Sequence, residues 1–452
     1  MMLLDYWPLK RFESKKENVL LWQFKEKLPL MMLSIIFSVV TLIAQHKPYE
    51  QSASFDLYYR LINVPVTFVT YLIKTFWPYN LAAIYPFSPQ IPLWQAMGSL
   101  LFIIIFTLLV MVIIKRFPPL FAGWFWFSII TAPVIGILQV GNQVMADRYT
   151  YLPQTGIAIM LAWGIPAVLQ NENVHRKIFP PAALIFFTLL ALFTWKQCGH
   201  WKNSEALCNH MLKSTTDNYV AHFNMASVLL DKGETRKAIA HYNEVVRIRP
   251  NLILSYNKRG IAYARLGQYP QAFDDLNKVI ALKPDYADAY NSRGLIYHSL
   301  GQHKKALEDL NKAIALKPDG AEAYSNRGNV YLSLGQTQKA LADFDEAVRL
   351  QPDNPAIYFN RGNIYIGLAQ YQRAIEDFNQ AISLKPSYAD AYNNRAFIYL
   401  QQGNYQQAFD DYSQAISIKP DYADAYNNRA FIYLSTGNIA AGCRDAQKAC
   451  ER

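Results

Sequence analysis

A strict 34-residue period governs the second half of the chain and constrains its fold more than any other feature. Proline recurs at this step six times without exception, and arginine recurs at the same step nine residues after each proline. The prolines are Pro250, Pro284, Pro318, Pro352, Pro386 and Pro420, and the arginines are Arg259, Arg293, Arg327, Arg361, Arg395 and Arg429. Gly301 separates the stretches 289–300 and 304–315, and Pro318 follows the second stretch, where it interrupts no helical hydrogen bond. Each period is therefore expected to fold as two antiparallel helices.

Helix pairs repeated every 34 residues, with small, aromatic and proline positions in a fixed order, are typical of tetratricopeptide repeats. Glycine or alanine in the first helix and alanine in the second let the paired helices approach closely. Counting by proline gives seven units: 219–252, 253–286, 287–320, 321–354, 355–388, 389–422 and 423–452. The junction 201–218 contains a further helix, about 204–214, which is expected to cap the first unit. This half of the chain is therefore predicted to be an α-solenoid.

Residues 1–200 are of a different character, because they carry five apolar segments long enough to cross about 30 Å of hydrocarbon as helices. The segments are approximately 28–45, 92–114, 119–140, 151–170 and 179–195. The segment 57–77 is also apolar but carries Arg60 and Lys74, charges that are costly at the bilayer centre and cheap at its surface. The sequence predicts an all-α protein in which a multi-span membrane domain precedes the repeats. Residues 57–77 are expected to lie on the membrane surface, with a sixth span as the alternative.

Basic residues in the short loops predict the topology of this membrane domain. The side that includes the N-terminus holds Lys10, Arg11, Lys15, Lys16, Lys25, Lys27, Lys115, Arg116, Arg176 and Lys177, and the opposite side holds Lys47, Arg60, Lys74 and Arg148. By the positive-inside rule the N-terminus is cytoplasmic, and five crossings place the repeats outside. Because 15 basic and 8 acidic residues lie in residues 1–200, most of the net charge of +10 reflects this topology. A nucleic-acid partner is therefore not expected.

Motifs for catalysis are scarce. The sequence contains neither a glycine-rich phosphate loop nor a G-x-S-x-G elbow, and no cofactor is expected. Cys198, His200, Cys208 and His210 form two C-x-H pairs. Residues at i and i+2 on a helix point in very different directions, so these pairs do not predict a metal site.

Four segments resemble a known family. Residues 4–9 (LDYWPL), 74–78 (KTFWP), 146–153 (ADRYTYLP) and 201–204 (WKNS), followed by tetratricopeptide repeats, are similar to bacterial relatives of the transmembrane-and-TPR O-mannosyltransferases. The resemblance implies a membrane glycosyltransferase of the GT-C type, an integral protein of the bacterial inner membrane that uses a lipid-phosphate sugar donor. It covers only the later part of the family's membrane domain, so the acidic catalytic loop of the family is expected to be missing.

This resemblance assigns few residues. Arg148 is a candidate contact to the phosphate of a polyprenyl-phosphate sugar, because arginine pairs well with phosphate oxygens. The alternative is a loop ion pair between Arg148 and Asp147. The other outward acids are Glu50 and Asp56. Catalytic residues are not assigned, and the chain alone is expected to be inactive as a transferase.

A ladder of asparagines suggests a second class of function. The sixth position of the units reads Asn224, Lys258, Ser292, Asn326, Asn360, Asn394 and Asn428, and the fifth adds Asn257, Asn291, Asn393 and Asn427. In tetratricopeptide proteins this part of the first helix lines the concave face, where an amide can pair with peptide main chain of any sequence. The alternative is that the asparagines are solvated or join neighbouring helices. We therefore expect a membrane-anchored scaffold that binds a protein or peptide through Asn224, Asn326, Asn360, Asn394 and Asn428, with the C-terminal part of a protein O-glycosyltransferase as the alternative.

Overall fold

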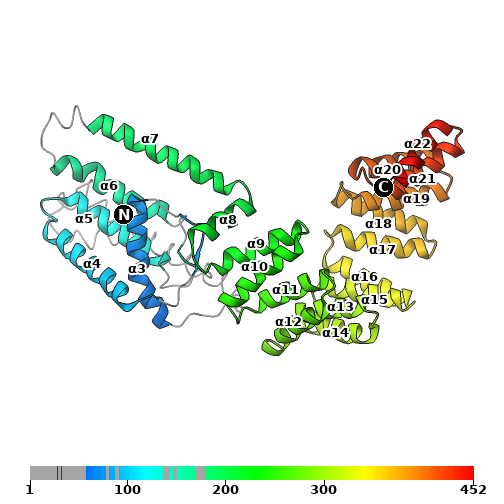
Figure 1. Ribbon diagram of the computed structural model, residues 1–452, viewed down its shortest axis with the longest axis horizontal. Helices are drawn as coiled ribbons and strands as arrows, with labels where there is room; N and C mark the ends of the chain where they lie inside the picture. The colour runs from blue at the N-terminus through cyan, green and yellow to red at the C-terminus, as the bar shows by residue number, and fades with distance from the viewer. Residues whose placement is uncertain are drawn as a thin grey trace. The chain divides into compact units, whose positions relative to one another are not determined.

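The computed structural model describes residues 28, 32, 57–77, 81–86, 91–135, 143–145, 150–168 and 179–451 (Figure 1). These residues are almost entirely helical, and the expected all-α class with a tetratricopeptide solenoid is confirmed. The chain divides into two compact parts, residues 1–266 and 267–452. The expected span 28–45 and the candidate Arg148 lie outside the described residues.

The first part contains the apolar helices, a two-stranded sheet and the beginning of the repeat array. Its elements are α3 (Leu57–Phe76), β1 (Tyr85–Pro86), α4 (Leu93–Val112), α5 (Pro118–Thr131), η1 (Ala132–Val134), β2 (Gln143–Met145), α6 (Tyr151–Val168), α7 (Phe179–Cys198), η4 (Gly199–Trp201), α8 (Ser204–Ser214), α9 (Tyr219–Asp231), α10 (Thr235–Ile248) and α11 (Ile253–Arg265). Strands β1 and β2 pair antiparallel. Helix α5 is shorter than the expected 119–140 segment because Pro133 lacks the N–H that would continue its hydrogen-bond ladder.

Helices α3, α4, α5 and α6 share one aromatic core. Phe68 and Tyr71 of α3 are buried against Trp124 and Phe127 of α5, with Val110 of α4 and Ile157 of α6 completing the cluster. The rings of Phe68 and Phe127 meet edge to face with centroids 5.2 Å apart. Segment 57–77 is therefore a helix with one buried face, and its placement on the membrane surface stays a prediction.

Two glycines set the closest helix crossing in this core. A Cβ atom on Gly123 of α5 would overlap the carbonyl oxygen of Gly156 of α6, and a Cβ atom on Gly156 would overlap the carbonyl oxygen of Gly123. Small residues at such crossings let two backbones touch, as is common between helices inside membranes. The contact between α5 and α6 therefore depends on the absence of side chains at both positions.

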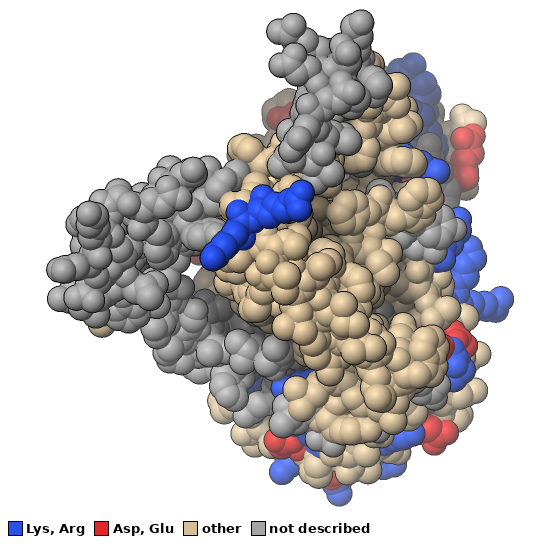
Figure 2. All heavy atoms as spheres, turned by 90° about the vertical axis from the view of Figure 1, so that its left-hand side faces the viewer, with Lys and Arg blue, Asp and Glu red and all other residues tan. Residues whose placement is uncertain are grey.

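Two of the described helices, Leu93–Val112 and the stretch Pro180–Trp201, are long and apolar enough to cross a membrane, with mean hydropathies of 2.4 and 1.4. The side chains of both helices are largely exposed, since only 11% of the first helix and none of the second is buried. Figure 2 faces this side of the molecule and shows an expanse of uncharged residues with few charges on it. Exposed apolar areas of this kind indicate an interaction with lipid or protein.

The segment 81–85 packs against helix α8 and the first repeat unit. The side chain of Asn218, at the start of α9, donates to the carbonyl oxygen of Ile84 (3.2 Å), and Nε2 of His210 lies 2.8 Å from the carbonyl oxygen of Leu81. Ala82 is fully buried in the core that includes Met211 of α8 and Ala221 of α9. Helix α8 therefore covers the first unit from one side and packs together with this segment.

The second part holds the remaining repeat helices. They are α12 (Tyr269–Leu282), α13 (Ala287–Ser299), α14 (His303–Leu316), α15 (Ala321–Ser333), α16 (Thr337–Leu350), α17 (Pro355–Gly367), α18 (Tyr371–Leu384), α19 (Ala389–Gln401), α20 (Tyr405–Ile418), α21 (Ala423–Ser435) and α22 (Ile439–Cys450). The first helices of all seven units begin at Tyr219, Ile253, Ala287, Ala321, Pro355, Ala389 and Ala423, the residues at which the proline count starts each unit.

Within a unit, the two helices are joined by a turn that needs a left-handed residue. Gly335 provides it in the fourth unit with φ of 70°, whereas Ala369 holds the same place in the fifth unit with φ of 56°. The helices then pack closely, because a Cβ atom on Gly328 or Gly362 would press against the ring of Phe344 or Phe378. The small positions read from the sequence are therefore packing positions.

Candidate peptide-binding site

Buried ion pairs hold the units that carry the candidate site. In the fifth unit, Nε and Nη2 of Arg361 donate to the two carboxylate oxygens of Asp377 at 2.9 and 2.7 Å, and Nη1 donates to Asp345 of the fourth unit at 2.7 Å. This pairing raises the pKa of the Arg361 guanidinium above its ordinary range. The same bidentate pair recurs in four other units as Arg293–Asp309, Arg327–Asp343, Arg395–Asp411 and Arg429–Asp445. These periodic arginines therefore fix the helix pairs and are not available to a ligand.

Some of the sixth-position asparagines have hydrogen-bonded side chains and others do not. Nδ2 of Asn326 donates to Oδ1 of Asn291 at 3.0 Å, and Nδ2 of Asn394 donates to Oδ1 of Asn363 at 2.8 Å. Within the described part of the chain, the side chains of Asn224, Asn360 and Asn428 make no hydrogen bond that would occupy them. The ladder is thus partly a set of links between neighbouring first helices, which was the alternative expected from the sequence.

Contrary to the expectation from the ladder, most of the fifth-position asparagines do not line a peptide-binding surface, because they are buried. Asn257, Asn291 and Asn393 are only 4, 9 and 8% exposed. Side chains at this depth cannot pair with an extended peptide on the surface. In these three units the fifth position faces the packed interior, about a quarter turn from the sixth, whereas Asn427 of the last unit is exposed.

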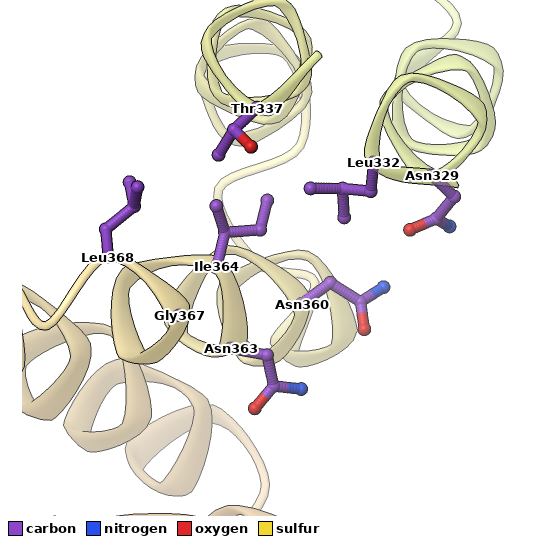
Figure 3. Close-up of a pocket in the computed structure, with 8 residues that line it drawn as sticks. All are labelled: Asn329, Leu332, Thr337, Asn360, Asn363, Ile364, Gly367 and Leu368. Atoms are coloured by element: carbon purple, nitrogen blue, oxygen red, sulfur yellow. The ribbon is translucent and has the colours of Figure 1, made fainter. Parts of the chain in front are cut away.

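A cavity opens where the fourth and fifth units meet. Its volume is about 360 Å³, at the lower end of the range of about 300–1,000 Å³ that is usual for ligand sites. The lining residues are Asn329 and Leu332 of α15, Thr337 of α16, Asn360, Asn363, Ile364 and Gly367 of α17, and Leu368 (Figure 3). Leu332 and Ile364 point toward each other across it, and the three amides lie together along one side. The cavity therefore has an apolar floor and an amide rim.

The structure brings one of the predicted residues, Asn360, into this cavity and adds two that the ladder did not include. Asn329 and Asn363 occupy the ninth position of their units, three residues after the sixth. Residues three apart lie on one face of a helix, so the same helical register would have found them. Asn326, Asn394 and Asn428 lie in the same register of neighbouring first helices but do not line the cavity, and Asn224 is exposed in the first unit.

The C-x-H pairs are brought together in part. The imidazoles of His200 and His210 stack with centroids 3.8 Å apart, whereas Cys208 is buried in the core of the first unit and Cys198 is exposed. Burial raises the pKa of the Cys208 thiol, which keeps the thiol in its uncharged form. Among the described residues, no three His, Cys, Asp or Glu side chains form a group that could hold a metal ion.

Sequence comparisons agree with the repeat architecture. The family described as TPR repeat matches residues 226–267, 262–301, 294–335, 328–368, 362–403 and 398–437. This segment is a tetratricopeptide repeat array.

The array is similar to the repeats of curated transferases. Protein O-mannosyl-transferase TMTC1 of Homo sapiens is 30% identical over 122 residues, which are 26% of this chain and 13% of that protein. TMTC4 of Mus musculus is 33% identical over 101 residues, 22% of this chain and 13% of that protein. The similarity lies in the repeat region, and the chain spans only a small part of the length of these relatives.

Parts of this chain are similar to solved structures. MamA is 26% identical over 35% of this chain and 92% of its own, with a TM-score of 0.33. PilF of Pseudomonas aeruginosa is 16% identical over 47% of this chain and 97% of its own, with a TM-score of 0.40. Likenesses at these TM-scores carry no inference about function.

Proposed function

We propose that the chain is a membrane-anchored scaffold whose repeat array binds an extended protein segment. The observation that carries the proposal is the cavity between the fourth and fifth units, which combines unoccupied amides with an apolar floor. Asn329 and Asn360 each offer two donors and an acceptor, the groups that pair with a peptide bond whatever its side chain. Tetratricopeptide arrays present such grooves to protein partners, and the neighbouring arginines are held in internal ion pairs.

Peptide selection tests this part of the proposal. A display library of random dodecapeptides would be selected on the full chain in lipid nanodiscs. The variant with Asn329 and Asn360 both changed to alanine should bind the selected peptides about tenfold more weakly, since each lost hydrogen bond is worth about 0.5–1.5 kcal/mol. Its helicity should fall little.

A matched control removes amides that serve the fold instead. Asn277, Asn311 and Asn379 accept hydrogen bonds from Arg293, Arg327 and Arg395. Changing these three asparagines to alanine should lower the melting temperature and leave peptide affinity unchanged. Failure to select any peptide on the parent chain, or equal affinity in the variant lacking the Asn329 and Asn360 amides, would contradict peptide binding at this cavity.

Membrane anchoring, with the array on the extracytoplasmic side, rests on the bare apolar sides of α4 and α7 and on the loop charges. Strand β1, which precedes α4, pairs with β2, which follows α5. Segment 81–85, next to β1, packs against α8 and α9, which follow α7. The chain therefore returns to the same side after the pair α4–α5 and again after the pair α6–α7. This arrangement supports an even number of membrane crossings between β1 and β2 and between β2 and α8. A reporter fused after Asn218 should behave as exported and one after Arg116 as cytoplasmic, and protection of the array from protease in spheroplasts would contradict this topology.

A relationship to glycosyltransferases is the second candidate, favoured by the names of the relatives that the array resembles. In this view the chain presents acceptor proteins to a catalytic domain, and Arg148 contacts the phosphate of a polyprenyl-phosphate sugar. The chain alone is expected to be inactive. Sugar transfer by the purified chain that is lost on Asp56→Asn or Glu50→Gln would show instead that it carries its own catalytic carboxylate.

A further inference from the structure

The cavity between the fourth and fifth units has a counterpart one unit later that the protein fills with its own side chain. The seventeenth position of a unit, the first residue of its second helix, is Thr337 in the fourth unit and Tyr371 in the fifth. Tyr371 packs against the core cluster that contains Ile398. Ile398 is the counterpart of Ile364, which lines the cavity. The place that Thr337 leaves open therefore corresponds to a tyrosine ring.

The absence of a side chain at Gly367 on the facing helix enlarges the opening. Gly367 and Leu368 line the cavity, whereas Gln401 and Gln402 stand at the equivalent positions of the sixth unit. A Cβ atom on Gly367 would meet no atom within 4 Å, so nothing else occupies this side. The fourth and fifth units thus lack a tyrosine ring and one glutamine side chain that the next pair of units has.

We propose that this cavity binds a phenylalanine or tyrosine side chain of an uncharged, extended peptide, which supplies the ring that Thr337 does not. The inference rests on the proposed function, because it assigns the residue class that anchors the bound segment. The ring lies on Leu332, Ile364 and Leu368. The main chain on either side of it pairs with the free amides of Asn329 and Asn360.

The charges around the cavity exclude other anchors. None of the eight lining residues is ionisable. Arg327 and Arg361, the arginines of the two first helices, are each bound to both oxygens of a buried aspartate. A charged anchor would lose its hydration here without gaining a counter-charge, which is unfavourable in a partly enclosed site. A terminal carboxylate of the peptide finds no free cation among these residues either.

Two variants that the fold already accepts elsewhere test the proposal. Thr337→Tyr places in the fourth unit the residue that the fifth and sixth units carry as Tyr371 and Tyr405, and Gly367→Gln copies Gln401. Peptides would be selected from a random dodecapeptide display library on the full chain, and their affinities measured as amidated, acetylated synthetic peptides. Phenylalanine or tyrosine should be enriched at one fixed position with uncharged neighbours. Each variant should weaken these peptides at least tenfold, as expected when one aromatic side chain is no longer buried.

The possible outcomes separate this inference from the proposed function. Selected peptides whose anchor is charged or aliphatic, or whose affinity is unchanged in both variants, overturn the aromatic anchor and leave peptide binding standing. A parent chain that selects no peptide overturns both. Ring-bearing peptides that lose affinity in Thr337→Tyr but keep it when alanine replaces the peptide's ring also overturn the inference, because the ring is then not what the cavity holds.

Discussion

Arg361 offers a direct test of how the array is held together, because one guanidinium binds two carboxylates of very different burial. Asp377 is 6% exposed and accepts two hydrogen bonds, whereas Asp345 is 57% exposed and accepts one. Asp377→Ala and Asp345→Ala each remove one carboxylate from the same arginine. Asp345→Ala is therefore the matched control for Asp377→Ala.

The two changes should differ strongly in cost. Removing Asp377 leaves a guanidinium that is only 18% exposed without its buried partner, a loss of about 3–5 kcal/mol. Removing Asp345 breaks a solvent-screened pair worth about 0–1 kcal/mol. Repeat units interact mainly with their neighbours, so the loss should be local to the fourth to sixth units.

Hydrogen exchange measured by mass spectrometry reads this local free energy. Amides of α17 and α18 should lose protection by roughly a hundredfold to a few thousandfold in Asp377→Ala and by less than about tenfold in Asp345→Ala, at 1.4 kcal/mol for each factor of ten. The double variant Arg361→Met, Asp377→Leu should recover most of the loss, since Met225 occupies the arginine position of the first unit with 3% exposure. Equal losses in the two single variants would refute the assignment of Asp377 as the stabilising partner.

Three further changes follow from the packing. Ala369→Gly should raise the unfolding free energy of the array by about 1 kcal/mol in urea titration, because the left-handed φ of 56° favours glycine, and a decrease would show that the turn is unstrained. Gly123→Ala should separate α5 from α6 and lower the melting temperature in nanodiscs, whereas Gly98→Ala, whose Cβ would meet nothing within 4 Å, should not. Burial lowers the pKa of His222 and of His241, and the proximity of His241 lowers that of His222 further. The unfolded state then binds more protons below pH about 6.5, so protection of residues 219–248 should fall as the pH drops from 7.5 to 5.5, and His241→Gln should reduce this slope.

The repeat architecture could be predicted from the sequence because the units share one pattern of residues. Proline follows the second helix in six units, glycine makes the turn in six of the seven, and alanine or glycine in the first helix packs closely against the second, so local geometry and packing agree along the array. The arginines kept the same step, yet their buried partners were missed. Asp377 lies sixteen residues after Arg361, and no helical period joins two residues that belong to different helices.

The apolar half was harder to read. Hydropathy finds apolar segments but not their partners, so the crossing of Gly123 with Gly156 and the packing of α3 against α5 had no one-dimensional signal. The same holds for Asn218 and His210, which bind segment 81–85 from more than a hundred residues away in the chain. Contacts between distant segments depend on tertiary packing, which residue patterns do not encode.

The most informative positions of a periodic chain are those that leave the period. Thr337 stands where the next two units have tyrosine, and Gly367 stands where the following unit has glutamine. Ala369 replaces the turn glycine two residues later and adopts a left-handed conformation that is costly for alanine. Thr337 lines the cavity, and Ala369 directly follows the lining residue Leu368. Since the same fold accepts tyrosine at this position in the next two units and glycine at the turn of the six other units, it does not require Thr337 or Ala369. The strain at Ala369 and the packing that Thr337 gives up therefore support the proposal that this cavity binds a ligand.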